Sequence, residues 1–124
     1  MKTLVLVAVT VSFILSSAVV AHAGKRLTTG ASGLSSNVEC TVLNVSETKD
    51  ITVITKIHNG AGVLLSQSGE VTLGPGVRTF SGHAASDLWC EFLIVSGSTK
   101  DVRGSMVIYE GSGNVVATEV AREK

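Results

Sequence analysis

Two stretches of the sequence decide the fold: CTVLNVSETKDITVITKIHNGAG at residues 40–62 and CEFLIVSGSTKDVRGSMVIYEGSG at residues 90–113. Aligned with one single-residue gap in the first turn, they are identical at ten of 23 positions, beginning with Cys40 and Cys90. Each contains a β-branched run, a turn with Thr-Lys-Asp, a second run and a Gly-x-Gly turn, which predicts a three-stranded meander with one apolar face. Two such units can bury these faces against each other, with residues 69–87 carrying the chain from one sheet to the other. Duplication and convergence of similar hairpins both explain the repeat, and the sequence leaves both open.

The chain around the repeat follows the same pattern of short strands and turns. Apolar and polar residues alternate in the β-branched runs, as in strands with one buried face. No stretch of ten residues has the apolar period of a helix, so we expect no substantial helix. Turns are predicted at 59–62, 75–76 and 111–114, where Gly, Asn and Pro supply the required backbone angles. The expected strands are 37–45, 51–58, 63–68, 70–73, 77–81 (a possible edge strand), 88–95, 102–110 and 115–121.

Residues 1–23 are organised like a signal peptide. Lys2 precedes a seventeen-residue, largely apolar run that ends at Val20, and Ala21-His22-Ala23 fits a signal-peptidase site. We expect cleavage after Ala23, no stable membrane insertion after cleavage, and a secreted or periplasmic protein. The alternative is an uncleaved anchor, for which this run would be at the lower limit of a membrane-spanning length. Residues 24–36, rich in Gly, Ser and Thr, are predicted to be a flexible mature N-terminus, and 37–124 a single β-sandwich domain.

The two cysteines, Cys40 and Cys90, are the only ones in the chain. In the oxidising compartment that the leader predicts, we expect them to form a disulfide bond. The enclosed loop of about 50 residues corresponds to roughly 4 kcal/mol in the chain-entropy description of disulfides. The alternative is a pair of buried free thiols.

Cysteines some 50 residues apart on alternating strands, together with the Leu73-Gly74-Pro75-Gly76 corner, resemble small bacterial exported immunoglobulin-like proteins. The resemblance covers residues 37–121 and implies an all-β, immunoglobulin-like, two-sheet antiparallel β-sandwich of seven or eight strands with one inter-sheet disulfide. The sequence departs from antibody-type domains because Trp89 directly precedes Cys90 and because Leu88 stands where the tyrosine corner would have Tyr. The resemblance implies no catalytic residue.

Composition and spacing argue against several classes of function. Ten basic and ten acidic residues give a net charge of zero, which disfavours binding to nucleic acid through electrostatics. His58 and His83 have no second ligand at a usual metal-binding spacing, so we expect no metal, and His58 to be solvated. The Gly-x-Gly turns lack the Lys-Ser/Thr of a phosphate-binding loop, and no cofactor is expected.

Few side chains in the sequence suggest chemistry. Ser81, His83 and Asp87 are the residue types of a catalytic triad, but they lie in one short segment without a nucleophile elbow. Glu39 and Glu91 each adjoin a cysteine, and we expect both to be solvated rather than an acid–base pair.

Three further positions are candidates for surface roles. Trp89 and Phe80 are candidates for contact with a partner, Trp89 because it should point away from the Cys90 face. Asn44 begins the glycosylation sequon Asn44-Val45-Ser46, which matters only in a host with that machinery.

We therefore expect an exported, non-enzymatic β-sandwich protein that is a binding or structural module. Its partner would be a protein or glycan ligand outside the cytoplasm, and the protein itself a monomer or weak oligomer. The alternative is a subunit of a surface polymer or pilus-like assembly that pairs through an edge strand, helped by residues 24–36. A small hydrolase that uses the segment 81–87 is a remote alternative.

Overall fold

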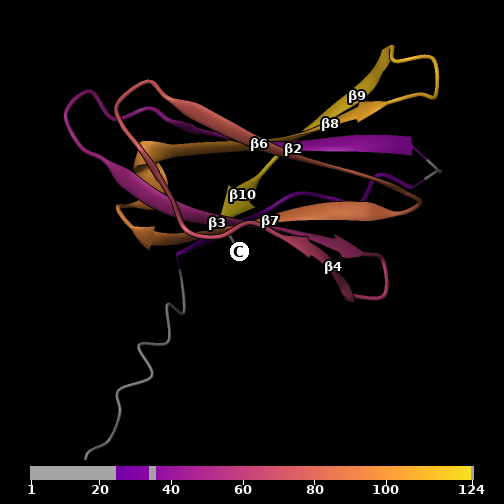
Figure 1. Cartoon of the computed structure of the whole chain (residues 1–124), viewed down its shortest axis with the longest axis horizontal. Helices are drawn as coiled ribbons and strands as arrows, with labels where there is room; N and C mark the ends of the chain where they lie inside the picture. Colours follow the sequence, from indigo (N-terminus) through magenta and orange to yellow (C-terminus); the bar gives the residue numbers. More distant parts are fainter. Residues whose placement is uncertain (1–24, 34–35, 124) are drawn as a thin grey trace, which may run out of the picture.

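The structure, a computed structural model, describes residues 25–33 and 36–123, so the predicted signal segment lies outside the described residues. These residues form two antiparallel sheets stacked in two layers (Figure 1). The prediction of an all-β, two-sheet sandwich is confirmed. Ten strands are present in the described residues, and the one helical element there is the 3₁₀ turn Thr99–Asp101.

Each sheet is built from strands of both halves of the chain. Sheet A has the order β10-β1-β7-β3-β4, with β5 also paired to β3, and sheet B has the order β6-β2-β8-β9. The strands of sheet A are β1 (Arg26–Thr28), β3 (Ile51–Asn59), β4 (Leu64–Gln67), β5 (Val71–Leu73), β7 (Leu88–Ser96) and β10 (Arg122–Glu123). The strands of sheet B are β2 (Ser36–Asn44), β6 (Arg78–Ala85), β8 (Val102–Tyr109) and β9 (Val115–Val120).

The core lies between the two sheets and follows the alternation in the sequence. Every second residue of β3 from Ile51 to Ile57 is buried, and β8 repeats this pattern from Val102 to Ile108. The disulfide between Cys40 of β2 and Cys90 of β7 crosses this core, with the two Cα atoms 5.9 Å apart. Both cysteines are fully buried, so the predicted disulfide is confirmed as an inter-sheet bond. The buried apolar residues are Leu27, Val38, Cys40, Val42, Ile51, Val53, Ile57, Leu73, Leu88, Cys90, Phe92, Ile94, Val102, Met106 and Ile108.

The two similar stretches do not form two separate meanders, and that prediction is wrong. The first stretch places β2 in sheet B but β3 and β4 in sheet A, and the second places β7 in sheet A but β8 and β9 in sheet B. Strands are therefore exchanged between the two units: β2 pairs with β8, and β7 pairs with β3. The order of strand pairing is the same for both units, but the register differs by two residues: Cys40 lies opposite Met106, whereas Cys90 lies opposite Ile57 and not opposite Thr55, the counterpart of Met106.

The crossing between the sheets in the first stretch is fixed by Asn44, which is fully buried at the end of β2. Its side-chain amide donates to the carbonyl oxygens of Lys49 (2.7 Å) and Leu73 (2.9 Å), and its Oδ1 accepts from the backbone N–H of Ser46 (2.9 Å). These bonds turn the chain out of sheet B and give both polar atoms of the buried amide a partner. In the folded chain, the Asn of the predicted sequon is thus a structural residue.

One pairing differs from the immunoglobulin pattern. In immunoglobulin domains, the strand after the second cysteine strand pairs with that strand. Here β8 pairs with β2 in the opposite sheet, and β1 lies beside β7 instead. The two-sheet sandwich is thus confirmed, whereas this pairing departs from the immunoglobulin order and the immunoglobulin-like assignment is not confirmed.

Part of the segment 24–36, predicted to be flexible, is a strand. Arg26–Thr28 form β1, which lies between β7 and β10. Leu27 anchors it, since this side chain is only 6% exposed and joins the core. A strand of three residues is too short to show alternation, so β1 could not be predicted from the pattern of apolar residues.

Candidate functional site

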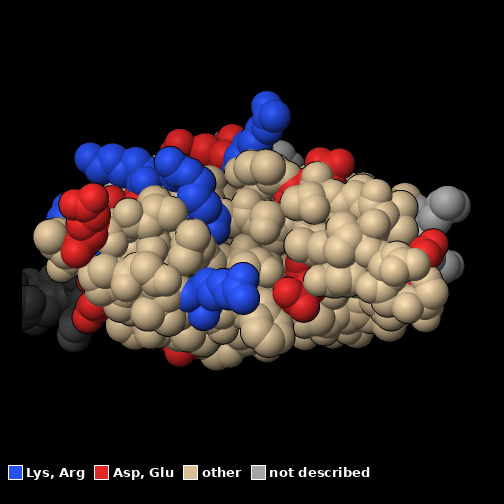
Figure 2. Space-filling view, turned by 90° about the horizontal axis from the view of Figure 1, so that it is seen from above, with Lys and Arg blue, Asp and Glu red and all other residues tan. Residues whose placement is uncertain are grey.

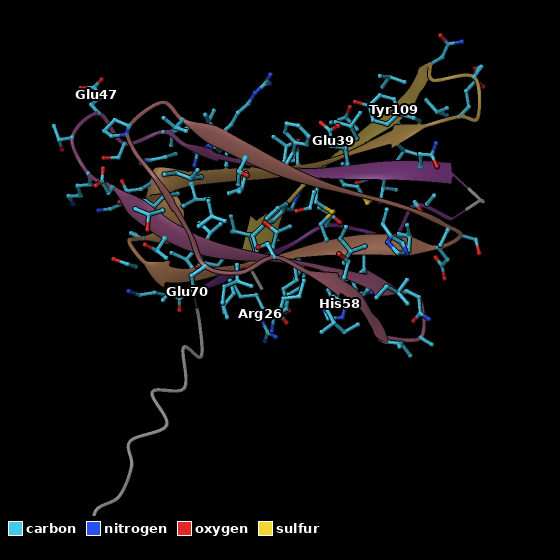
Figure 3. The ribbon with its side chains drawn as sticks, viewed as in Figure 1. Arg26, Glu39, Glu47, His58, Glu70 and Tyr109 are labelled. Carbon is cyan, nitrogen blue, oxygen red and sulfur yellow. A yellow bond between two sulfur atoms is a disulfide. The ribbon has the colours of Figure 1, made fainter. Side chains whose placement is uncertain are left out.

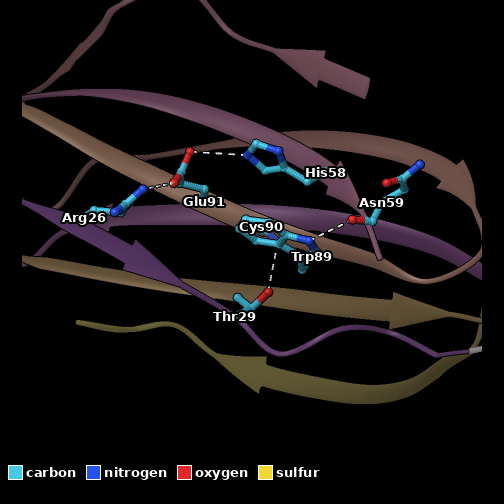
Figure 4. A network of polar contacts seen from close by, with 7 residues as sticks. All are labelled: Arg26, Thr29, His58, Asn59, Trp89, Cys90 and Glu91. Carbon is cyan, nitrogen blue, oxygen red and sulfur yellow. Dashed lines mark hydrogen bonds and ion pairs between the residues drawn. The ribbon is translucent and has the colours of Figure 1, made fainter. Parts of the chain in front are cut away.

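The outer face of sheet A carries a network of polar side chains from three adjacent strands. Arg26 of β1 and His58 of β3 both project from this face, the lower one in Figure 3. Between them lies Glu91 of β7, whose Oε2 is 3.1 Å from Arg26 Nη1 and whose Oε1 is 3.3 Å from His58 Nε2 (Figure 4). Glu91 is only 7% exposed, so the prediction that it is solvated is wrong. Because β7 is an interior strand of the sheet, Glu91 has Arg26 on one side and His58 on the other, and these two side chains bury it.

Trp89 is held in place next to this network. Its ring stacks on that of His58, with ring centroids 4.2 Å apart and an angle of 14° between the planes. Its indole N–H donates to the backbone carbonyl of Asn59 at 2.9 Å. The His58 side chain is only 13% exposed, so the expectation of a solvated histidine is also wrong. The stack and the hydrogen bond together fix the orientation of the indole.

A cleft of about 380 Å³ lies beside this indole. The chain that follows β1 runs along β7, since Thr29 N bonds to Cys90 O (3.0 Å) and Ser32 N to Leu88 O (2.7 Å). Trp89 thus stands between His58 on the β3 side and this segment on the β1 side. We call this hollow the Trp89 cleft; it is lined by Thr28, Thr29, Ala31, Gly60, Asp87 and Trp89.

The end of the Trp89 cleft is formed by a close approach of two turns. Asp87 has a φ of 55°, in the left-handed region that Asp adopts more readily than most residues. Its carboxylate lies against residue 60, where a Cβ would collide with Asp87 Oδ2. A side chain at residue 60 would therefore displace the Asp87 carboxylate from its position at the rim of the cleft.

Phe80, the second predicted contact residue, lies on the other side of the molecule. It is 63% exposed on β6, opposite Thr41 of β2, and so on the outer face of sheet B. Figure 2 looks onto this face and shows a wide area with few charged side chains. Trp89 and Phe80 are both surface residues, but they belong to opposite faces and cannot contact one small ligand together.

Two edge strands also expose apolar side chains. On β4, Leu64 is 46% exposed and Leu65 38%, and on β9, Val115 is 59% exposed and Val116 62%. These residues occupy equivalent places after the Gly-x-Gly turns of the two stretches. Each strand ends the strand order of its sheet, so one side of its backbone has no partner strand within the described residues.

The residues of the suggested triad are not joined. Ser81 and His83 lie on β6 opposite Cys40 and Val38, while Asp87 lines the Trp89 cleft. No hydrogen bond connects any two of the three within residues 25–33 and 36–123. The described part of the chain also contains no group of three potential metal ligands. No helix in that part is long and apolar enough to cross a membrane.

Comparison with known proteins gives no identification: no protein family, curated protein or solved structure matches this chain. The network around Glu91 was missed from the sequence, although a signal was present. Trp89 and Glu91 alternate on one strand, and Lys56 and His58 on another, which places each pair on an outer face. Only the pairing of β7 with β3, which the sequence did not predict, brings the two pairs side by side.

Proposed function

We propose that this chain is an exported, non-enzymatic β-sandwich module that binds a ligand outside the cytoplasm through the Trp89 cleft. The observation that carries the proposal is an aromatic side chain held rigidly at the wall of a cleft. An interaction site whose aromatic anchor is fixed before binding loses little conformational entropy when the ligand arrives. The buried disulfide supports the exported location, because such bonds persist in oxidising compartments.

The test combines processing and binding. The full chain is expressed in a bacterial host that exports it, and the mass of the exported form is measured. We expect it to start at Gly24 and to be two hydrogens lighter than the reduced chain. The NMR chemical shifts of the backbone amides are then followed during titration with probes of three classes. These are methyl pyranosides, tetramethylammonium chloride and acetyl-phenylalanine amide. Shifts at Trp89 and Asp87 with any class support the proposal, whereas a cytoplasmic chain or a cleft that no probe perturbs contradicts it.

A second candidate is assembly through edge strands, which the exposed apolar residues of β4 and β9 favour. β9 has a single charged side chain, Glu119, and lacks the Lys and Pro residues that commonly prevent edge pairing. This candidate predicts concentration-dependent oligomers in sedimentation that disappear in Val116→Lys. A monomer at all concentrations for the exported form would exclude it.

A further inference from the structure

We propose that the Trp89 cleft binds a single pyranose ring of a glycan, an inference that rests on the proposed function and specifies its ligand. The ring would lie against the indole, with its hydroxyl groups directed to Asp87 and Thr28. Three features of the cleft lead to this ligand class: the part of Trp89 that is available, the polar groups beside it, and the size of the space.

Trp89 offers its aromatic face and no hydrogen bond. The indole N–H is already used by the carbonyl of Asn59 at 2.9 Å, and His58 covers one face at a centroid distance of 4.2 Å. The remaining face is turned toward the segment that follows β1, which forms the other wall of the cleft. The negative face of an aromatic ring attracts polarised C–H groups, and a pyranose ring presents several of these on one side.

The polar groups of the cleft suit the rim of a sugar ring. The exposed Asp87 carboxylate can accept hydrogen bonds from two neighbouring hydroxyl groups, and bonds to a charged acceptor are stronger than neutral ones. Thr28 lies on the outer face of β1, and its hydroxyl can donate or accept. The Thr29 hydroxyl is not available, because it accepts from Cys90 N at 2.9 Å and is buried.

The size and charge of the cleft argue against other ligands. A volume of about 380 Å³ is at the small end of ligand pockets and accommodates one ring rather than a folded segment of a partner. A cationic group would be held by one aromatic wall and one exposed carboxylate, where recognition of such cations commonly uses a cage of several aromatics.

The experiment uses Trp89 as its own reporter, since it is the single tryptophan of the chain. The exported protein is titrated with the methyl β-pyranosides of glucose, galactose and N-acetylglucosamine and with their β-linked tetramers. Separate titrations use tetramethylammonium chloride and acetyl-phenylalanine amide. Trp89 fluorescence gives the affinity, and amide shifts locate the site. The variant Asp87→Asn removes the charge and retains the left-handed backbone that Asn tolerates. Asp50→Asn, in an exposed loop outside the cleft, is the matched control.

We expect at least one sugar to change Trp89 fluorescence and to shift the amides of residues 28–31, Gly60 and Asp87. Asp87→Asn should lower the affinity for that sugar about tenfold, whereas Asp50→Asn should leave the affinity unchanged. Shifts outside the cleft, or equal affinity for Asp87→Asn, would overturn the inference. If only tetramethylammonium chloride or acetyl-phenylalanine amide perturbs the cleft, the sugar assignment is wrong but the proposed binding function stands. If no probe of any class does, both fail.

Discussion

Adding one methyl group at Gly104 of β8 tests how the two halves of the core fit together. A Cβ at this position would lie 2.6 Å from Cδ2 and 2.7 Å from Cε2 of Phe92, and 3.0 Å from the Cβ of Ala121. The equivalent residues of the first stretch are Val53 and Val42, both fully buried. One unit thus fills its core with two valines, and the other with a phenylalanine and a glycine.

We expect Gly104→Ala to lower the free energy of unfolding by about 1–3 kcal/mol, the usual cost of overpacking a core. This is a large share of the roughly 5–15 kcal/mol that stabilises a domain. Shortening Phe92, the side chain that the new methyl group would meet, should relieve this overpacking. In the double variant Phe92→Leu/Gly104→Ala, the two changes should couple favourably by about 1 kcal/mol or more, because the residues are in contact.

The assay is urea unfolding of the disulfide-bonded protein, followed by Trp89 fluorescence, with the four members of the cycle compared. The control is Gly82→Ala on β6, where the nearest atom to a new Cβ is the Val38 carbonyl oxygen at 3.6 Å, an ordinary contact. That change should be neutral or stabilise the protein by up to about 1 kcal/mol through the unfolded chain. A Gly104→Ala protein as stable as the parent, or an additive cycle, would refute the packing described here.

Three further predictions follow from single features. Replacing Cys40 and Cys90 by Ala should cost about 4 kcal/mol, given their separation of 50 residues, and urea unfolding of the exported variant would measure it; a loss under about 1 kcal/mol would contradict the entropic account. Asn44→Asp turns an acceptor toward two carbonyl oxygens, so thermal unfolding should show a loss of about 3 kcal/mol, and an unchanged melting temperature would contradict the buried network. The pKa of Glu110 is lowered by hydrogen bonds, first from Ser112 at 2.6 Å, so Ser112→Ala should raise that pKa in an NMR titration. Because the lowered pKa favours the folded state above the carboxyl's unfolded pKa, this small stabilisation should disappear as the pH falls through the folded pKa.

The sequence predicted where strands begin and end because turn chemistry is local. All eight predicted strands are present, and most ends lie within two residues of the prediction; the largest difference is β6, which runs on from the predicted end at Ser81 to Ala85. The disulfide followed from the predicted compartment and the count of cysteines. Neither inference needs any knowledge of which strands are neighbours.

The partners of the strands could not be predicted in the same way. The loop after β2 looks like a hairpin turn in the sequence, but the buried Asn44 amide bonds to a carbonyl 29 residues away and redirects the chain to the other sheet. A contact of this range depends on the completed fold. The same holds for Glu91: alternation places it on an outer face, and only Arg26, 65 residues away, together with His58, buries it there.

The differences between the two stretches locate the candidate site. Identical residues include the disulfide, the Thr-Lys-Asp segment and the glycines of the second turn, which are needed for the fold of either unit. Glu91 and His58 are at positions where the stretches differ, with Thr41 and Tyr109 as their counterparts, and Trp89 directly precedes the second stretch where Glu39 precedes the first. Glu39 and Tyr109 lie on the outer face of sheet B, away from His58 (Figure 3). The order of strand pairing is thus the same for both units, but in the described residues the stacked indole and its cleft lie on the outer face of sheet A. The shared strand arrangement does not need the stacked indole, yet a ring stack and a hydrogen bond hold this side chain in one orientation. Trp89 and its cleft are therefore the part of the molecule to which we assign the proposed binding function.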